Sequence, residues 1–180
     1  MLTGEHTGLR GIESGDLAQL LEWRNRPDFR RYFREYRELT SEQQTAWYEN
    51  VVLKDPSVRM FAIVSLEDDR LLGACGLCYI DWVNRNADFS IYIGDGGAYI
   101  DETFAPDAAA TLLRYGFEEM NLHRVWTEIY SIDKAKQAFF PALGFTLDGT
   151  HRQTYWCDGA WQDSLFYGLL RDEFGVSPGS

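Results

Sequence analysis

The chain has 180 residues, of which 45% are hydrophobic and 25% charged, a size and balance that predict one globular domain with a sizeable core. Its net charge of −11 disfavours broad contact with nucleic acid or anionic membranes and favours cationic small molecules or basic peptides. No apolar run approaches the roughly 18 residues of a membrane span, and the first residues lack a signal-peptide pattern. We expect a cytoplasmic domain over residues 1–174 and a disordered tail at 175–180.

The first third of the chain is predicted to be mainly helical. A short strand at 9–12 precedes a helix that starts at Ser14, and Pro27 begins a second short helix. Thr40 is a suitable N-cap for a third helix.

The pattern then changes to strands at 60–66, 71–80 and 87–93. A helix at 106–120, a strand at 123–130 and a helix at 134–140 follow, and strands at 150–157 and 161–170 flank an Asp158-Gly159 turn. This order predicts an α/β or α+β domain with a mixed sheet. A ligand is expected where the strand ending at 93 meets the helix beginning at 106.

Cys75 and Cys78 form a C-x-x-C pair, which raises a redox or zinc hypothesis. The pair lies in a predicted strand, where residues three apart point to opposite faces. A redox pair belongs at a helix N-terminus, and a zinc site needs ligands beyond Cys157 and three scattered histidines. We therefore predict buried thiols and no metal site.

Residues 24–37 contain six arginines and only two acidic residues. The net charge of this segment is therefore about +4, and that of the rest of the chain about −15. The six are Arg24, Arg26, Arg30, Arg31, Arg34 and Arg37. One interpretation is a solvated helix face with local ion pairs. The other is a site for a ligand that bears phosphate or carboxylate, because guanidinium groups suit both.

Several motifs in order resemble the ribosomal-protein N-acetyltransferase branch of the GNAT superfamily, over residues 9–171. They are LEWRNRP at 21–27, YIDWVNRNA at 79–87, IYIGD at 91–95, NLHRV at 121–125, LGF at 143–145 and the Asp158-Gly159 hairpin. The resemblance implies a mixed central sheet of about seven strands whose fourth and fifth strands splay apart around acyl-CoA. It also implies transfer of an acyl group, normally acetyl, from acyl-CoA to a primary amine of a small molecule or peptide.

Two places depart from the family pattern. The family binds the donor pyrophosphate on a glycine-rich loop, whereas residues 100–105 contain no glycine and Asp101, Glu102 and Asp107 add negative charge. Acidic residues suit a helix N-terminus that binds no anion, so this end is predicted to be satisfied internally. Many family members carry a tyrosine that is the usual candidate for donating a proton to the leaving thiolate. The matching position here is Phe139 or Phe140, whose ring cannot donate a proton.

The resemblance and its departures leave three functions open. The first is an N-acyltransferase that uses acyl-CoA through an atypical loop. The second is a transferase on the same scaffold that takes an acyl carrier protein or aminoacyl-tRNA donor through residues 24–37. The third is a binding module without catalysis. The oligomeric state is predicted to be a monomer or a homodimer.

The resemblance also implies a set of site residues. Glu128 is the candidate base, with Asp88 and Ser90 as weaker candidates, and each has the alternative of a structural hydrogen bond. The candidate donor-binding residues are Ile91, Ile93, Gly96, Gly97, Thr103, Phe104, Ala105, Asp133 and Phe140. The candidate acceptor-binding residues are Arg31, Phe33, Tyr36, Trp82, Asn84, Tyr155 and Trp156.

Overall fold

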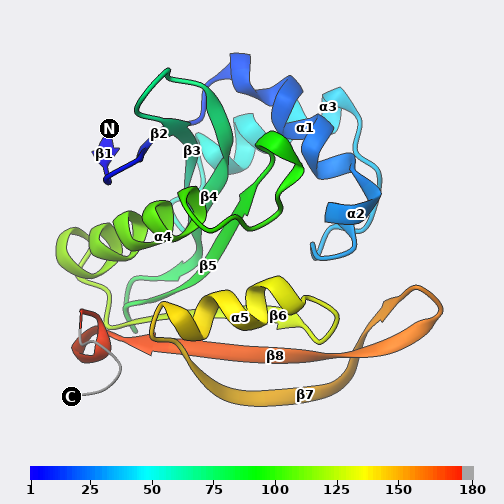
Figure 1. Ribbon diagram of the computed structural model, residues 1–180, viewed down its shortest axis with the longest axis vertical. Coiled ribbons are helices and arrows are strands. Elements are labelled where there is room, and N and C mark those ends of the chain that lie inside the picture. Colours follow the sequence, from blue (N-terminus) through cyan, green and yellow to red (C-terminus); the bar gives the residue numbers. More distant parts are fainter. Residues whose placement is uncertain (176–180) are drawn as a thin grey trace.

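The computed structural model describes residues 1–175, so the predicted tail lies outside the described residues except for Gly175. One eight-stranded sheet runs through the molecule in the order β1-β2-β3-β4-β5-β6-β8-β7 (Figure 1). Its strands are β1 (Leu2–Thr3), β2 (Thr7–Gly11), β3 (Arg59–Ser65), β4 (Leu71–Asp81), β5 (Asn86–Ile93), β6 (Arg124–Tyr130), β7 (Thr146–Cys157) and β8 (Ala160–Leu170). The β5–β6 pair is parallel and the other neighbouring pairs are antiparallel. The predicted mixed sheet is confirmed, with β1 as a short addition at its edge.

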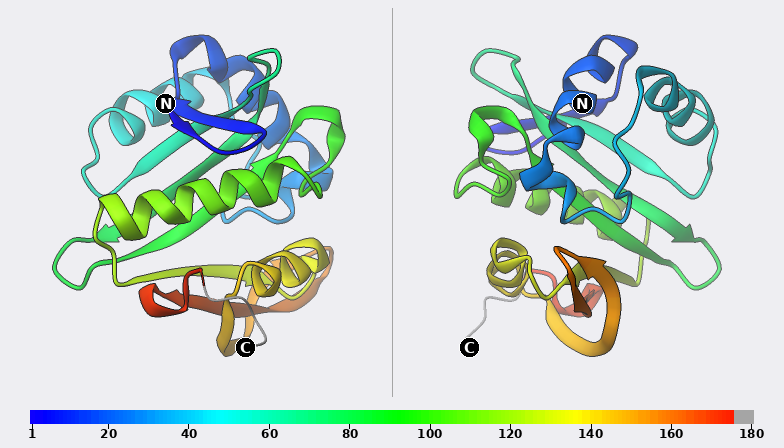
Figure 2. Two further views of the ribbon diagram at one scale, coloured as in Figure 1. Left: turned by 60° about the vertical axis from the view of Figure 1, so that its left-hand side comes forward. Right: turned by 90° about the vertical axis from the view of Figure 1, so that its right-hand side faces the viewer.

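Helices cover both faces of the sheet (Figure 2). They are α1 (Leu17–Asn25), α2 (Pro27–Arg30), α3 (Ser41–Trp47), α4 (Phe104–Arg114) and α5 (Lys134–Ala142). Shorter helical turns lie at Ser14–Asp16, Tyr48–Val52, Asp95–Gly97, Tyr115–Glu119 and Arg171–Glu173. One core packs α4 and α5 on the sheet around Leu112, Phe117 and Phe140, and a second packs α1 and α2 on the opposite face around Trp23 and Phe29.

The helix α4 begins at Phe104, two residues before the predicted start at Pro106. Proline is tolerated there because the first-turn N–H groups have no partner within the helix. The carboxylate of Asp101 accepts hydrogen bonds from Phe104 N at 2.8 Å and Ala105 N at 2.7 Å. This side chain, from a residue before the helix, explains the earlier start.

The second predicted helix is shorter than its pattern indicated, because α2 ends at Arg30 and residues 31–40 are irregular. The side chain of Asn25 fixes the far end of this segment, donating to Leu39 C=O and accepting from Leu39 N, both at 2.8 Å. The predicted cap at Thr40 is confirmed, because its hydroxyl accepts from Gln43 N at 3.3 Å. The C-terminal end of the irregular segment is therefore fixed both to α1, through Asn25, and to the start of α3, through Thr40.

The C-terminal hairpin turns at Asp158-Gly159 as predicted. Both residues have positive φ angles, 52° and 76°, which a two-residue hairpin turn of this kind requires. The strand β7 begins at Thr146, four residues before the predicted start, and the pairing shifts between His151 and Tyr155. The hairpin curves away from the rest of the sheet (Figure 1).

The thiols of the C-x-x-C pair lie within β4 and are free. Cys75 is fully buried, and burial raises its pKa. Burial also raises the pKa of Cys78 to about 12, so neither thiol ionises readily near neutral pH. Within residues 1–175 no helix is long and apolar enough to cross a membrane.

Candidate active site

The parallel strands β5 and β6 are paired only at one end. Their register covers residues 86–88 of β5 and 124–126 of β6. Just beyond it, the hydroxyl of Thr127 donates to Phe89 C=O at 3.1 Å. In the rest of the described strands no ladder pair joins the two, and their ribbons diverge (Figure 1). The short edge strand β1 shifts the numbering by one, so the strands predicted to splay as fourth and fifth are β5 and β6. Their predicted splay is confirmed, and the facing strand edges are open to a ligand.

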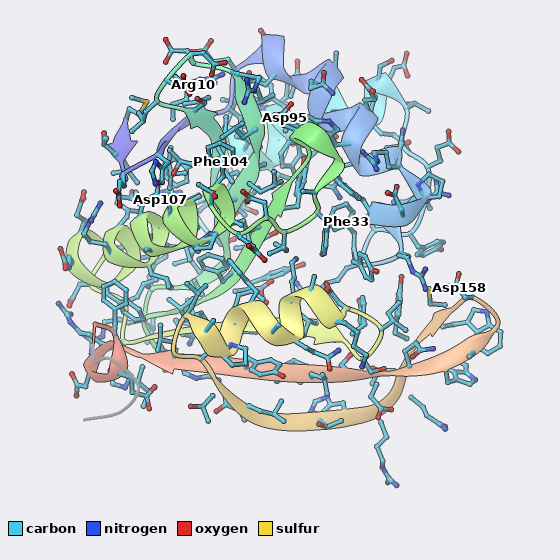
Figure 3. All side chains as sticks on the ribbon, viewed as in Figure 1. Arg10, Phe33, Asp95, Phe104, Asp107 and Asp158 are labelled. Atoms are coloured by element: carbon cyan, nitrogen blue, oxygen red, sulfur yellow. The ribbon has the colours of Figure 1, made fainter. Side chains whose placement is uncertain are left out.

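A cavity of about 450 Å³ lies against this divergence. Strand alternation places Asp88, Ser90 and Tyr92 of β5 on one face, and Glu128 of β6 reaches the same cavity from the other strand. Phe33 lines it from the segment after α2 and is labelled in Figure 3. Further apolar and aromatic lining residues are Tyr32, Trp47, Val51, Val58, Met60, Cys78 and Tyr79. All three predicted catalytic candidates therefore line one cavity.

The guanidinium of Arg34 bridges the two diverging strands. Its Nη1 donates to Asp88 Oδ2 at 2.6 Å, and its Nε donates to Glu128 Oε2 at 3.1 Å. Asp88 is 4% exposed, and its other oxygen, Oδ1, is buried without a hydrogen-bond partner among residues 1–175. Burial raises the pKa of Asp88 although Arg34 acts to lower it. In the cavity the Arg34 guanidinium thus lies between two carboxylates, and within the described part of the chain Oδ1 of Asp88 remains free to accept a hydrogen bond.

A short hydroxyl chain positions Glu128. The Ser164 hydroxyl on β8 donates to Glu128 Oε1 at 2.6 Å, and the Thr154 and Ser164 hydroxyls are 2.6 Å apart. The carboxylate of Glu128 is therefore bound from both sides, by Ser164 and by Arg34. Such fixed orientation suits a general base, which must face the proton that it removes.

A lysine from α5 enters the same cavity. Lys136 is 8% exposed and lines the cavity together with Asp88 and Glu128. Its Nζ atom lies 5.0 Å from the centre of the Tyr99 ring, and the Tyr99 hydroxyl donates to Asp133 Oδ2 at 3.1 Å. Burial lowers the pKa of Lys136, while the charges of Asp133 and Asp88 act to raise it. A buried lysine is uncommon enough to require an explanation.

The first turn of α4 has its N–H groups occupied. Asp101 accepts from Phe104 N and Ala105 N as described above, and it also accepts from Thr103 N at 3.1 Å. The predicted donor residues Thr103, Phe104 and Ala105 therefore already donate to a carboxylate. A donor pyrophosphate can use these N–H groups only if the Asp101 side chain moves away, so binding of a CoA donor at this turn requires that movement.

A second carboxylate of α4 is occupied by the N-terminal hairpin. Asp107 accepts from the backbone N of Glu5, His6 and Thr7 at 2.8, 3.0 and 2.8 Å, and from the Thr7 hydroxyl at 2.6 Å. Figure 3 shows Asp107 on α4 facing the β1–β2 end of the molecule. These bonds outweigh the effect of burial and lower the pKa of Asp107. The donor-side helix is tied to the sheet edge.

The other predicted donor residues are divided between the core and the loop. Ile91, Ile93 and Phe140 are buried in the core beneath α4 and α5. Gly96 and Gly97 have φ angles of 65° and 76°, and Gly97 lies beside Arg26. Asp133 caps α5, accepting from Lys136 N at 3.0 Å as well as from Tyr99.

The predicted acceptor residues do not form one group. Phe33 lines the cavity, and Arg31 forms an ion pair with Asp158 at the hairpin turn. The Tyr155 hydroxyl donates to Arg31 C=O at 3.1 Å, which brings the hairpin to the same segment. The remaining four, Tyr36, Trp82, Asn84 and Trp156, are exposed and do not line the cavity.

The arginine cluster is largely neutralised. Five of its six members pair with carboxylates: Arg26, Arg30, Arg31, Arg34 and Arg37. Arg24 lines the cavity instead, with its guanidinium 5.4 Å from the Phe33 ring centre. Local ion pairs therefore account for most of the cluster, and this weakens the case for an extended phosphate-binding surface.

Two cavity residues were not singled out from the sequence. Arg34 was one member of a cluster, and nothing in the local pattern marks it as the one that reaches two distant strands. The burial of Lys136 could be predicted from the sequence, because the residue lies three and four positions before the apolar pair Phe139 and Phe140. That spacing places all three on one helix face, and a lysine there is a buried charge.

Residues 6–146 match the family described as acetyltransferase (GNAT) domain. Because this span is more than three quarters of the chain, the protein belongs to the GNAT acetyltransferase family. Its activity is accordingly the transfer of an acetyl group to an amine, as the resemblance implied.

Relatives match over nearly the whole length. The SPbeta prophage-derived N-acetyltransferase YokL of Bacillus subtilis is 27% identical, covering 98% of this chain and 97% of that protein. Spermidine N(1)-acetyltransferase of Vibrio cholerae is 24% identical, covering 92% and 94%. The crystal structure of the Vibrio cholerae spermidine N-acetyltransferase with CoA and spermine superposes with a TM-score of 0.84 at 23% identity, covering 93% of this chain and 96% of that one. The structural match establishes the fold.

Proposed function

We propose that this protein acetylates an amine that carries more than one positive charge, with an acyl-CoA as donor. The observation that carries the proposal is the Arg34 guanidinium held between Asp88 and Glu128. A site that holds a guanidinium between carboxylates is suited to a protonated amine. The net charge of −11 adds long-range attraction for polycations.

Two relatives support the substrate class and the donor. The Vibrio cholerae and Escherichia coli relatives are spermidine N(1)-acetyltransferases, and the Vibrio structure contains CoA and spermine. The diverging strands leave an open edge next to the cavity, where a thioester has access to the acceptor. We therefore place a polyamine such as spermidine first among the acceptors.

In the proposed reaction, Asp88 binds the acceptor and Glu128 acts as the general base. The incoming ammonium displaces Arg34 from the two carboxylates, and Asp88 holds the charged part of the acceptor. Glu128, oriented by Ser164, removes a proton from the reacting amine, directly or through water. The neutral amine then attacks the acetyl carbonyl carbon. The acyl donor supplies the acetyl group and leaves as a thiol.

The first experiment compares acceptors. We expect kcat/KM with acetyl-CoA to be highest for spermidine, lower for a monoamine of similar length such as hexylamine, and to fall for spermidine as salt screens the cavity. Asp88→Asn should reduce the preference for spermidine over hexylamine. Equal rates with both amines in the unaltered chain would contradict the proposed acceptor class.

A second experiment tests whether Arg34 occupies the acceptor position. Arg34→Gln removes the internal cation and leaves two carboxylates for an external one. We expect spermidine to raise the melting temperature of Arg34→Gln more than that of the unaltered chain. Arg26→Gln is the matched control, because Arg26 pairs with Asp28 on the same segment at 2.6 Å and neither residue lines the cavity. Equal stabilisation of both variants would count against displacement.

A different donor is the second candidate, favoured by the occupied first turn of α4. Melting with acetyl-CoA separates the two, because a ligand at about one hundred times its dissociation constant adds roughly 2.7 kcal/mol. For a chain of this length that is a rise of about 5–10 °C. With no shift at millimolar acetyl-CoA, an acyl carrier protein or aminoacyl-tRNA donor becomes the better hypothesis.

A further inference from the structure

The helix α5 carries a buried lysine one turn before Phe140, a position that the family resemblance matches to a proton-donating tyrosine. Lys136 and Phe140 are four residues apart on α5, so they lie on the same face one turn apart. Phe140 is completely buried against Phe89 and Phe145, and its ring has no proton to give. The neighbouring position on that face is therefore the nearest place for a replacement.

Lys136 connects the two faces of the sheet. Its helix packs on the core shared with α4, as the positions of Phe139 and Phe140 show. Asp88 and Tyr92, however, belong to the cavity on the other side, and Lys136 lines that cavity with them. The side chain thus reaches the cavity at the diverging strands, which is lined by Asp88 and Glu128.

The surroundings of Lys136 leave its amino group available. Within residues 1–175 its Nζ atom faces the Tyr99 ring at 5.0 Å and makes no ion pair or hydrogen bond. The charged groups around it are Asp133 from its own helix, Asp88 from β5 and Arg34 from the irregular segment. Burial lowers its pKa, so the ammonium releases a proton more easily than an exposed lysine does.

We propose that the ammonium of Lys136 is the general acid that protonates the departing thiolate of the donor. This inference rests on the proposed use of an acyl-CoA. The acceptor nitrogen forms a bond to the acetyl carbon while the carbon–sulfur bond breaks. Glu128, after releasing its first proton to water, takes the proton that the nitrogen loses as the amide forms, and Nζ gives a proton to the sulfur. Proton exchange with water then restores a carboxylate at Glu128 and an ammonium at Lys136.

The test uses two variants of Lys136 and one control. Lys136→Met keeps the length of the side chain without charge or proton, and Lys136→Arg keeps the charge but holds its proton too tightly to transfer it. Lys134→Met is the control, because Lys134 is exposed on the same helix. We expect kcat to fall about 10²-fold to 10³-fold in both Lys136 variants and to stay unchanged in Lys134→Met.

A binding measurement adds a readout that does not depend on turnover. The thiol of bound CoA can be titrated by the ultraviolet absorbance of its thiolate. A nearby cation favours the thiolate, so we expect the pKa of the bound thiol to be about one unit higher in Lys136→Met than in the unaltered chain or in Lys136→Arg. Loss of turnover in Lys136→Arg with an unchanged thiol pKa identifies proton transfer rather than charge alone.

Other outcomes overturn the inference. Full turnover in Lys136→Arg would show that charge suffices, and full turnover in Lys136→Met would show that the residue is dispensable. Faster turnover in Lys136→Met would show that the lysine obstructs the donor. If the unaltered chain neither binds CoA nor uses acetyl-CoA, the proposed donor fails and this inference fails with it. Normal turnover by the unaltered chain with indifferent Lys136 variants overturns the inference alone. Melting of each variant establishes that it is folded.

Discussion

The polar groups at the start of α4 have hydrogen-bond partners within the protein, whereas some of those in the cavity at the diverging strands have none among the residues that the structure describes. At α4, the N–H groups of the first turn donate to the Asp101 carboxylate, and N–H groups of the N-terminal hairpin donate to the Asp107 carboxylate. In the cavity, Asp88 keeps a buried oxygen without a partner, and Lys136 keeps an amino group without one among residues 1–175. Negative charge near a site therefore has two different roles in this molecule. At α4 it completes the fold, and in the cavity it remains available for a ligand.

The cavity side of this comparison is tested most strongly by Glu128→Gln. Glutamine keeps the shape and the contact with Ser164 but cannot accept the amine proton. We expect kcat to fall about 10²-fold to 10⁴-fold with little change in melting temperature. Steady-state kinetics with acetyl-CoA and spermidine measure it, and Glu118→Gln, at an exposed position after α4, is the control. Undiminished turnover in Glu128→Gln would place the base elsewhere.

The α4 side is tested by Asp107→Ala. This change leaves three backbone N–H groups and one hydroxyl without their acceptor, so we expect a loss of about 2 kcal/mol in the free energy of unfolding. That corresponds to a fall of about 4–8 °C in melting temperature. Denaturant unfolding and thermal melting measure it. A loss confined to kcat, with unchanged stability, would refute the structural role.

Asp101→Ala tests whether the cap competes with the donor. Loss of a side-chain cap costs a helix about 1 kcal/mol, and the freed N–H groups become available to a pyrophosphate. We therefore expect a slightly less stable chain that binds CoA about fivefold more tightly, measured by calorimetry. Asp101→Asn, which can still cap, should bind like the unaltered chain. Weaker CoA binding in Asp101→Ala would mean that Asp101 assists the donor.

A smaller effect is expected from pH. Because the folded-state pKa of Asp107 lies below its unfolded value of about 4, its contribution is complete above that value and is lost as the pH falls through the folded pKa. The stability difference between the unaltered chain and Asp107→Asn should therefore be constant near neutral pH and shrink below about pH 4. Urea unfolding across this range measures it, with Glu102→Gln as the control. A difference that grows on acidification would contradict the assigned shift.

The sequence predicted the order of elements well because hydrophobic period and turn residues are local signals. The Asp158-Gly159 turn and the Thr40 cap are examples, and the structure confirms both. The acidic residues before α4 also indicated a helix end satisfied from within. Such signals depend on residues a few positions apart, so they can be read without knowing the fold.

The cavity could be predicted only in part. Period two in β5 places Asp88 and Ser90 on one face, but their cavity neighbours Glu128 and Arg34 lie 40 and 54 positions from Asp88 in the sequence. Which arginine of the cluster turns inward depends on the irregular segment, and local pattern does not fix its path. The exposed Trp82 and Asn84 were assigned to the acceptor side through the family resemblance, without a contact to support them.

The hairpin turn at Asp158 has a further consequence. Arg31 binds this turn, and only three residues along the chain Arg34 binds the cavity carboxylates. Trp156 and Trp161 lie on the two strands that the turn connects, 5.2 Å apart at their ring centres and both exposed. If an acceptor displaces Arg34 as proposed, we expect the neighbouring Arg31–Asp158 contact and this indole pair to shift with it. The two tryptophans would then serve as an intrinsic fluorescent reporter, and stopped-flow mixing with spermidine should show a change in their emission without any added label.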